Sequence, residues 1–233
     1  MDIKTYTTDL GKTFDIEIAP APADGKRYPV VVLIHGNLGL ANPFGPQLRD
    51  FTEDIARLGY LAALPSYYPT GHSDLRDKDI RSHVPALAAA VKYLCARADA
   101  DPDRLGLVGF SLGGGIAMSY INGSPTGTVK VFADFYGYVA PLLGAGVANF
   151  PPTIMFHNEH DPIVPVGGNS EPLADALAAA GIAHEPVRPY RWYQGNWERG
   201  FGHAFEPGSP DDAASRVGTK TWLTTHMSPI GKP

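Results

Sequence analysis

Residues 30–34 form an unbroken run of apolar side chains, Val-Val-Val-Leu-Ile, after a turn-rich segment. Such a run is typical of a strand that is buried on both faces, as in a parallel sheet. Similar short runs recur at residues 61–64, 105–109, 129–135 and 153–157, and segments with helical spacing of apolar residues separate several of them. Strands that alternate with helices predict an α/β fold, with a mostly parallel central sheet flanked by helices as a three-layer sandwich.

The remaining predicted elements extend this alternation. Two short strands at 3–6 and 13–18 come first, and a last strand is predicted at 188–192. Helices are expected from Gly45 to Gly59, over 80–98, from Ser111 onward, over 172–180 and over 212–226. No repeat, low-complexity tract or linker-like stretch divides the chain, so residues 1–233 are expected to form one domain. In such a sheet, reactive side chains belong at the carboxyl ends of the strands.

Composition and charge argue against several classes of function. The hydrophobic fraction of 44% and the charged fraction of 18% are ordinary for a folded globular protein. The formal net charge is -5 and the Lys and Arg residues are scattered, so a nucleic-acid partner is not expected. No window approaches the roughly 18 apolar residues that span a membrane, and no signal peptide is evident. Cys95 is the single cysteine, and the chain is expected in the cytoplasm.

The segment RLGLVGFSLGGG carries the strongest chemical pattern. Ser111 lies between Gly109 and Gly113, directly after an apolar strand and before a helix-compatible segment. This is the context of a nucleophile elbow, in which two glycines allow a sharp turn that lifts the serine oxygen to the tip of the strand. Alone, the pattern also fits a serine that caps a helix after a glycine-rich turn. Within the alternating series, it predicts Ser111 as the nucleophile of a hydrolase.

An oxyanion hole is expected beside this serine. The amide of Leu112 starts a helix, where N–H groups lack partners and the helix dipole is positive. The second donor is expected from the loop after residues 30–34, with the amide of Asn37 as first choice and that of Leu38 as second. His35, in the same loop, is expected to hydrogen-bond the loop rather than to act as the base.

A serine hydroxyl needs an imidazole to remove its proton and a carboxylate to orient that imidazole. The best acid is Asp161, which follows the strand at 153–157 in a short polar loop. Glu159 in the same loop and Asp134 in the preceding strand are the alternatives. His203, in the glycine-flanked segment GFGHAF, lies downstream of Asp161 and before the last helix, which completes the order Ser, Asp, His.

The other histidines fit structural roles better. His184 and His226 lie in a connecting segment and on the last helix, where exposure or a local hydrogen bond explains them. His157 and His160 precede Asp161 in a short cluster, but its spacing is not that of a known metal site. No metal and no cofactor is therefore expected.

The segments LIHGNLGL, GFSLGGG, HNEHDPIVP and GFGHAF resemble the dienelactone hydrolase family of the α/β-hydrolase superfamily. The resemblance implies an α/β-hydrolase fold and hydrolysis of an ester or lactone. The family usually carries a cysteine at the elbow, where this chain has Ser111, and its best-known members carry a glutamate where this chain has Gly36. The arginines that hold the carboxylate of dienelactone have no assured match, although Arg76 and Arg81 lie in a comparable region. An esterase with an oxygen nucleophile is therefore expected.

Aromatic residues are the main candidates for substrate binding. Trp192 and Trp197 lie before His203, and Tyr67 and Tyr68 follow the strand at 61–64. Each could line an apolar cleft or pack its loop onto the body of the protein, and Leu38 is a further candidate for the cleft.

The expected function is the hydrolysis of small carboxylic esters or lactones through an acyl-enzyme, with no nucleic-acid or membrane partner. Two alternatives stay open: a non-enzymatic ligand-binding protein of this fold, and a peptidase or amidase.

Overall fold

The computed structural model of the chain describes residues 1–20, 24–67, 80–139, 146–196 and 198–230. Within these residues, an eight-stranded sheet has the order β1-β2-β4-β3-β5-β6-β7-β8. The strands are β1 (Asp2–Thr7), β2 (Thr13–Ile18), β3 (Tyr28–Ile34), β4 (Leu61–Pro65), β5 (Ala100–Phe110), β6 (Val129–Phe135), β7 (Thr153–Phe156) and β8 (His184–Glu185). The pairs β1–β2 and β2–β4 are antiparallel, and every neighbouring pair from β4 to β8 is parallel.

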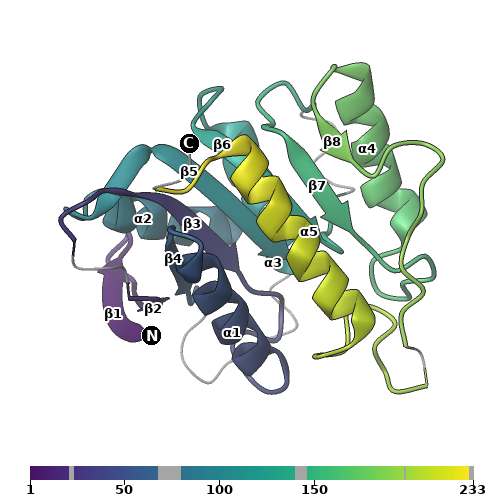
Figure 1. Cartoon of the computed structure of the whole chain (residues 1–233), viewed down its shortest axis with the longest axis horizontal. Helices are drawn as coiled ribbons and strands as arrows, with labels where there is room; N and C mark the ends of the chain where they lie inside the picture. The colour runs from purple at the N-terminus through teal and green to yellow at the C-terminus, as the bar shows by residue number, and fades with distance from the viewer. Residues whose placement is uncertain (21–23, 68–79, 140–145, 197, 231–233) are drawn as a thin grey trace.

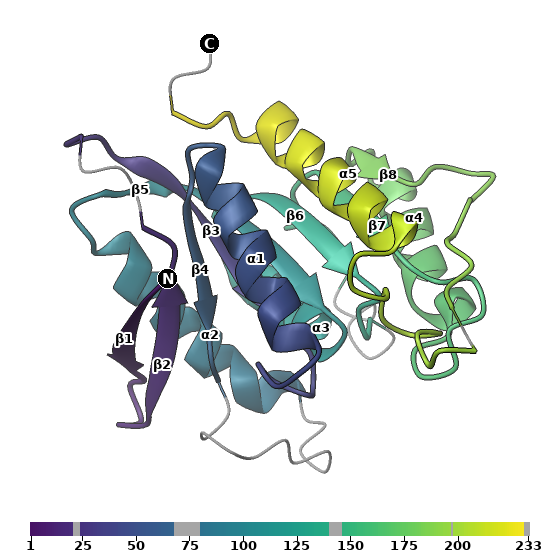
Figure 2. The same cartoon turned by 60° about the horizontal axis from the view of Figure 1, so that its bottom comes forward.

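Helices cover both faces of this sheet (Figures 1 and 2). On one face lie α1 (Phe44–Arg57) and α5 (Pro210–His226), and on the other lie α2 (Ile80–Cys95), α3 (Leu112–Gly123) and α4 (Ser170–Ala179). The predicted three-layer sandwich with a mostly parallel sheet is therefore confirmed.

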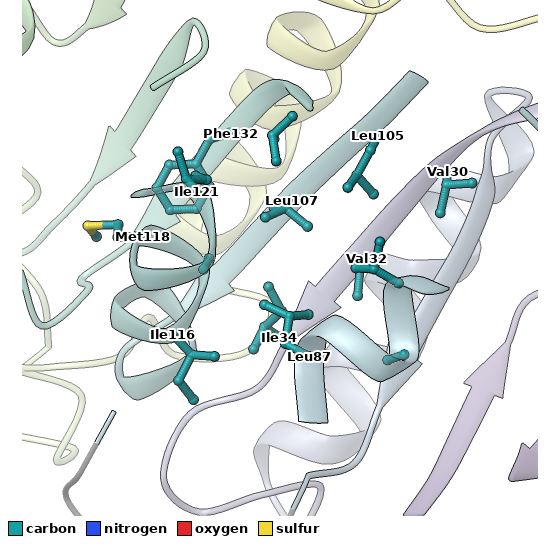
Figure 3. Packing of buried hydrophobic residues seen from close by; sticks show 14 of the residues in the cluster. Val30, Val32, Ile34, Leu87, Leu105, Leu107, Ile116, Met118, Ile121 and Phe132 are labelled. Atoms are coloured by element: carbon teal, nitrogen blue, oxygen red, sulfur yellow. The ribbon is translucent and has the colours of Figure 1, made fainter. Parts of the chain in front are cut away.

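Alternate residues of the central strands enter two separate cores. In β3, Val30, Val32 and Ile34 belong to the core under α2 and α3, which Figure 3 shows from close by. Val31 and Leu33 belong to the core under α1 and α5. Every residue of β3 and β4 is buried, which explains why these strands are apolar throughout rather than alternating.

One predicted element is wrong, and the others match the structure to within a few residues at their ends. The segment 188–192 is not a strand, because the last strand is the short β8 before it. Pro186 and Pro189 lack the N–H group that a strand donates to its neighbour, so pairing does not continue. Instead, the Tyr190 hydroxyl donates to the carboxylate of Asp175 on α4 at 2.5 Å.

Glycines let α3 pack directly on the ends of two strands. A Cβ atom on Gly113 would lie 2.1 Å from the carbonyl oxygen of Ile34. A Cβ atom on Gly109 would lie 2.6 Å from the Cα atom of Gly114. Neither position has room for a side chain, so the start of α3 lies against the backbone of β3 and β5. This close approach fixes where residue 111 lies.

The substitution Gly113→Ala tests this contact. The added methyl group would push α3 away from β3, and we expect the free energy of unfolding to fall by roughly 3 kcal/mol, at the upper end of overpacking costs. Urea unfolding followed by circular dichroism measures this.

Gly123→Ala, at the other end of α3, is the matched control. Its Cβ would have open space around it, so stability should stay the same or rise by up to about 1 kcal/mol. Equal stabilities of the two variants would contradict the packing constraint.

Candidate active site

Ser111 lies between β5 and α3 in a backbone conformation that residues with a side chain rarely adopt. Its φ is 54° and its ψ is -116°, and its amide donates to the carbonyl oxygen of Phe135 at 2.8 Å. Such strain persists only where the surroundings enforce it. Here the glycine contacts of α3 and the bond to Phe135 do so, and the Ser111 side chain lines a pocket at the carboxyl edge of the sheet.

Hydrogen bonds connect Ser111 to His203, which precedes α5, and His203 to Asp161, which follows β7. The Nε2 atom of His203 lies 2.9 Å from Ser111 Oγ, and its Nδ1 atom lies 2.5 Å from Oδ2 of Asp161. Because a carboxylate only accepts, Nδ1 carries the proton and Nε2 accepts from the serine hydroxyl. In this arrangement an imidazole can take the proton of a serine that attacks a carbonyl carbon.

Asp161 is buried and surrounded by donors. Its Oδ1 accepts from the amides of Ile163 at 2.8 Å and Val164 at 2.9 Å, and its Oδ2 lies 3.2 Å from Nε2 of His157 as well as near His203. Burial alone would raise the pKa of Asp161, but the hydrogen bonds from His157 and His203 outweigh it and hold the pKa well below its usual range. The carboxyl group is therefore ionised at neutral pH.

The two alternative acids lie elsewhere. Glu159 accepts from the side chain of Gln194 at 2.7 Å in an exposed position. Asp134 is fully buried beneath α3, where a Cβ on Gly114 would lie 2.3 Å from its Oδ1. Its Oδ2 accepts from the amide of Gly137 at 3.2 Å, and its Oδ1 has no partner among the described residues. Burial raises the pKa of Asp134 to about 7.

Of the predicted oxyanion donors, Asn37 and Leu38 line the same pocket as Ser111, and Leu112 directly follows Ser111. Leu112 is the first residue of α3, so its N–H group has no acceptor within the helix. Asn37 and Leu38 lie in the loop after β3 and line the pocket. A Cβ on Gly36 would lie 3.3 Å from the Cβ of Ser111, so this loop packs directly against the elbow.

His35 stabilises the same loop through a buried contact. Its ring is fully buried, its Nδ1 atom lies 2.8 Å from the carbonyl oxygen of Gly36, and Tyr67 stacks on it at 4.0 Å between ring centroids. Burial lowers the pKa of His35 to about 4, so the ring is neutral at pH 7. This agrees with the structural role expected for His35.

A pocket of about 240 Å³ opens beside Ser111 and His203. It lies between α1 and the strand ends, and its wall is mainly apolar or aromatic. The large apolar and aromatic side chains of this wall are Leu38, Phe44, Leu48, Phe110, Tyr136 and Ile163, and Asn37 and Gln47 also line the pocket. Among the described residues that line the pocket, none is Asp, Glu, Lys or Arg.

Of the predicted substrate-binding residues, Leu38 lines this pocket. Tyr67 is placed instead behind His35, to whose carbonyl oxygen its hydroxyl donates. Trp192 packs on the core beside α4, and its indole N–H donates to Glu171 at 3.1 Å. Neither ring is part of the pocket wall. Tyr68 and Trp197 lie outside the described residues.

The arginines considered for a substrate carboxylate do not line the pocket either, as far as the structure describes them. Arg81 lies in the first turn of α2 and is absent from the pocket wall. Arg76 lies outside the described residues.

Sequence reasoning missed several residues of the site. Tyr136 follows β6, and its ring meets that of His203 edge-on at 4.8 Å between centroids. The strand-end rule could have found Tyr136, because β6 ends at the same edge as β5. Phe44 and Leu48 come from α1, where helical spacing predicts a core face and does not distinguish it from a pocket wall. His157 was considered only as a metal ligand.

Two further observations concern the described residues alone. They contain no group of three or more His, Cys, Asp or Glu side chains that could hold a metal ion. Within the same residues, no helix has the length and apolar character needed to cross a membrane.

Comparisons with known proteins show which family and which fold this chain is similar to. The model of the dienelactone hydrolase family matches residues 17–226. A Synechocystis sp. protein provisionally named a carboxymethylenebutenolidase is 28% identical over 216 residues, which cover 81% of this chain and 84% of that protein. A Bradyrhizobium sp. protein named a probable 2-oxo-3-(5-oxofuran-2-ylidene)propanoate lactonase is 26% identical over 241 residues, 93% of this chain and 90% of that protein. The structure of a dienelactone hydrolase-like promiscuous phosphotriesterase from metagenomic libraries is 15% identical, with a TM-score of 0.78 over 97% of this chain and 98% of its own, and shares the fold.

The buried carboxyl group of Asp134 predicts a pH dependence of stability. Its pKa in the folded protein is about 7, above the ordinary value of 3.8, so between these values the folded state keeps a proton that the unfolded state loses. This contribution to stability is present at low pH and falls as the pH rises from about 4 to 7, by at most about 1.4 kcal/mol per pH unit.

Asp134→Asn removes this contribution. The free energy of unfolding of the variant, relative to wild type, should therefore increase as the pH rises from about 4 to 7. Urea unfolding at several pH values measures the difference. Parallel pH profiles of the two proteins would contradict this assignment.

Proposed function

Because the chain belongs to the dienelactone hydrolase family and is a hydrolase of carboxylic esters or lactones, we propose that Ser111, His203 and Asp161 act as its catalytic triad. The family and its α/β-hydrolase fold are those predicted from the sequence. The proposal for the triad rests on the continuous hydrogen bonds from Ser111 Oγ through the His203 ring to Asp161, at 2.9 and 2.5 Å.

In the first step, Ser111 Oγ attacks the carbonyl carbon of the substrate while His203 Nε2 takes the hydroxyl proton. The carbonyl π electrons move to its oxygen, which accepts from the amides of Leu112 and Asn37. Asp161 stabilises the imidazolium that forms. When the intermediate collapses, the bond to the alcohol oxygen breaks and that oxygen takes the proton from His203, which leaves an acyl group on Ser111.

In the second step, water replaces the alcohol. His203 takes a proton from a water molecule while the water oxygen attacks the acyl carbon. The oxyanion of the second tetrahedral intermediate accepts from the same two amides. Its collapse breaks the bond to Ser111 Oγ, which regains the proton from His203, and releases the acid. For a lactone, the alcohol of the first step stays attached to the acid that is released.

Glycine at position 36 supports this assignment of the base. The loop lies so close to the elbow that a Cβ at position 36 would be 3.3 Å from that of Ser111. With glycine there, this position offers no carboxylate beside the nucleophile. The imidazole of His203 is therefore the group within hydrogen-bond distance that can accept the proton.

The pocket wall favours uncharged, apolar substrates. Its described side chains offer mainly aromatic and aliphatic surface and include no Lys or Arg. A carboxylate on the substrate would lose its hydration there without gaining a Lys or Arg partner among these described side chains. We therefore propose small neutral esters or lactones as the substrate class.

Ser111→Ala tests the nucleophile. We expect kcat/KM for p-nitrophenyl acetate to fall at least about 1,000-fold, because the variant lacks the hydroxyl group that forms the proposed acyl-enzyme. Ser119→Ala on α3 is the matched control, since the Ser119 hydroxyl has no partner among the described residues, and it should retain activity.

A fluorophosphonate label distinguishes turnover from a ligand-binding role. Mass spectrometry should find the phosphonyl group on Ser111 in wild type. A folded protein in which Ser111 stays unlabelled, or equal hydrolysis by wild type and Ser111→Ala, would refute the proposed triad.

The charge preference can be measured with two esters of similar size. We expect kcat/KM for p-nitrophenyl butyrate to exceed that for p-nitrophenyl hemisuccinate at least about 10-fold. Leu38→Lys places a cation on the pocket wall and should shift the ratio toward the anionic ester several-fold. An unmodified enzyme that prefers the anionic ester would contradict the neutral substrate class.

A further inference from the structure

His157 directly follows β7 and lies next to Asp161, the proposed acid. Its side chain is fully buried. Its Nε2 atom is 2.7 Å from the carbonyl oxygen of Val164 and 3.2 Å from Oδ2 of Asp161, and its Nδ1 atom is 2.7 Å from the hydroxyl oxygen of Ser170, the first residue of α4.

These neighbours determine the tautomer of the ring. Nε2 faces two oxygen atoms that can only accept, so it carries the proton. Nδ1 faces a hydroxyl group, which can donate to it. The His157 ring therefore donates toward the Asp161 turn on one side and is held by Ser170 on the other.

Asp161 consequently has three hydrogen-bond donors and a further N–H group close by. The amides of Ile163 and Val164 donate to Oδ1, and the His203 ring donates to Oδ2. The Nε2–H group of His157, which donates to the carbonyl oxygen of Val164, lies 3.2 Å from the same Oδ2. A carboxylate held in this way cannot rotate without breaking several bonds. The donor from His157 also withdraws electron density from the oxygen that attracts the His203 proton.

We propose that His157 is a positioning residue that fixes Oδ2 of Asp161 toward His203 and weakens the attraction of that oxygen for the His203 proton. The proposal rests on the proposed triad. His157 touches no reacting atom and acts only through Asp161.

The groups around the His157 ring come from several elements. Asp134 on β6 interacts electrostatically with it. Ser170 faces it from α4, and Trp192 meets it edge-on at 6.2 Å between centroids. Asp161 lies beside the ring, and His203 contacts the same carboxylate oxygen of Asp161.

Two substitutions of His157 distinguish a role in positioning Asp161 from a role in packing alone. His157→Leu removes both ring nitrogens, whereas His157→Gln keeps an N–H donor near the place of Nε2. We expect His157→Leu to lower kcat for p-nitrophenyl acetate about 10-fold with KM unchanged. Its acid limb in the pH profile of kcat/KM should move to higher pH, because Asp161 then holds the His203 proton more strongly. His157→Gln should recover most of kcat and the wild-type limb.

Three results would overturn the proposal. These are a folded His157→Leu variant with unchanged kcat and pH profile, an acid limb that moves to lower pH, and a His157→Gln variant as impaired as His157→Leu.

Nitrogen-15 NMR of the wild-type histidine rings tests the arrangement without a leucine variant. The His157 signals, assigned by their absence in His157→Gln, should be those of the tautomer with the proton on Nε2. A proton on Nδ1 alone would overturn the proposal, even if His157→Leu does not fold. Activity that survives in Ser111→Ala would instead refute the triad, while the NMR result would still report on His157.

Discussion

The backbone contact between Gly113 and the end of β3 is the constraint on which the site depends. A side chain on Gly113 would meet the carbonyl groups of Ile34 and His35, so only glycine lets α3 begin there. The contact brings the first amide of α3 beside the loop that contains Asn37. With α3 in this position, Ser111 adopts a strained backbone conformation with a positive φ. The two apolar cores around β3 and β5 stabilise this turn.

The two faces of the sheet contribute different parts of the site. The face under α1 supplies the apolar pocket wall, and the face under α3 and α4 supplies buried polar groups that hold the acid turn. Asn169 is an example: its Oδ1 accepts from the amide of Val139, and its Nδ2 donates to the carbonyl oxygen of Pro165, both at 2.9 Å. This side chain joins the segment after β6 to the turn that carries Asp161. The position of the carboxylate thus depends on packing that never contacts the pocket.

The sequence predicts the candidate catalytic residues well, because their order along the chain and their places after strands are characteristic of this fold. Ser111 and Asp161 each follow an apolar strand, and His203 lies between Asp161 and the last helix. This is the chain order that the fold requires, so their meeting could be predicted. The pocket wall could not, because Phe44 and Leu48 have the same helical spacing as residues that fill a core. Trp192 is ambiguous for a related reason: an aromatic ring near the proposed base in sequence can lie away from the pocket, as this one does against Glu171.

Ser111 meets His203 across 92 positions of the chain, and His203 meets Asp161 across 42. A ribosome synthesises these segments in order, so the residues of β3, β5 and α3 are made well before His203. An unfinished chain therefore carries Ser111 without the proposed base, and the hydrogen bonds that join Ser111, His203 and Asp161 cannot yet form. The long separation makes completion of the proposed triad one of the last events in the synthesis of the protein.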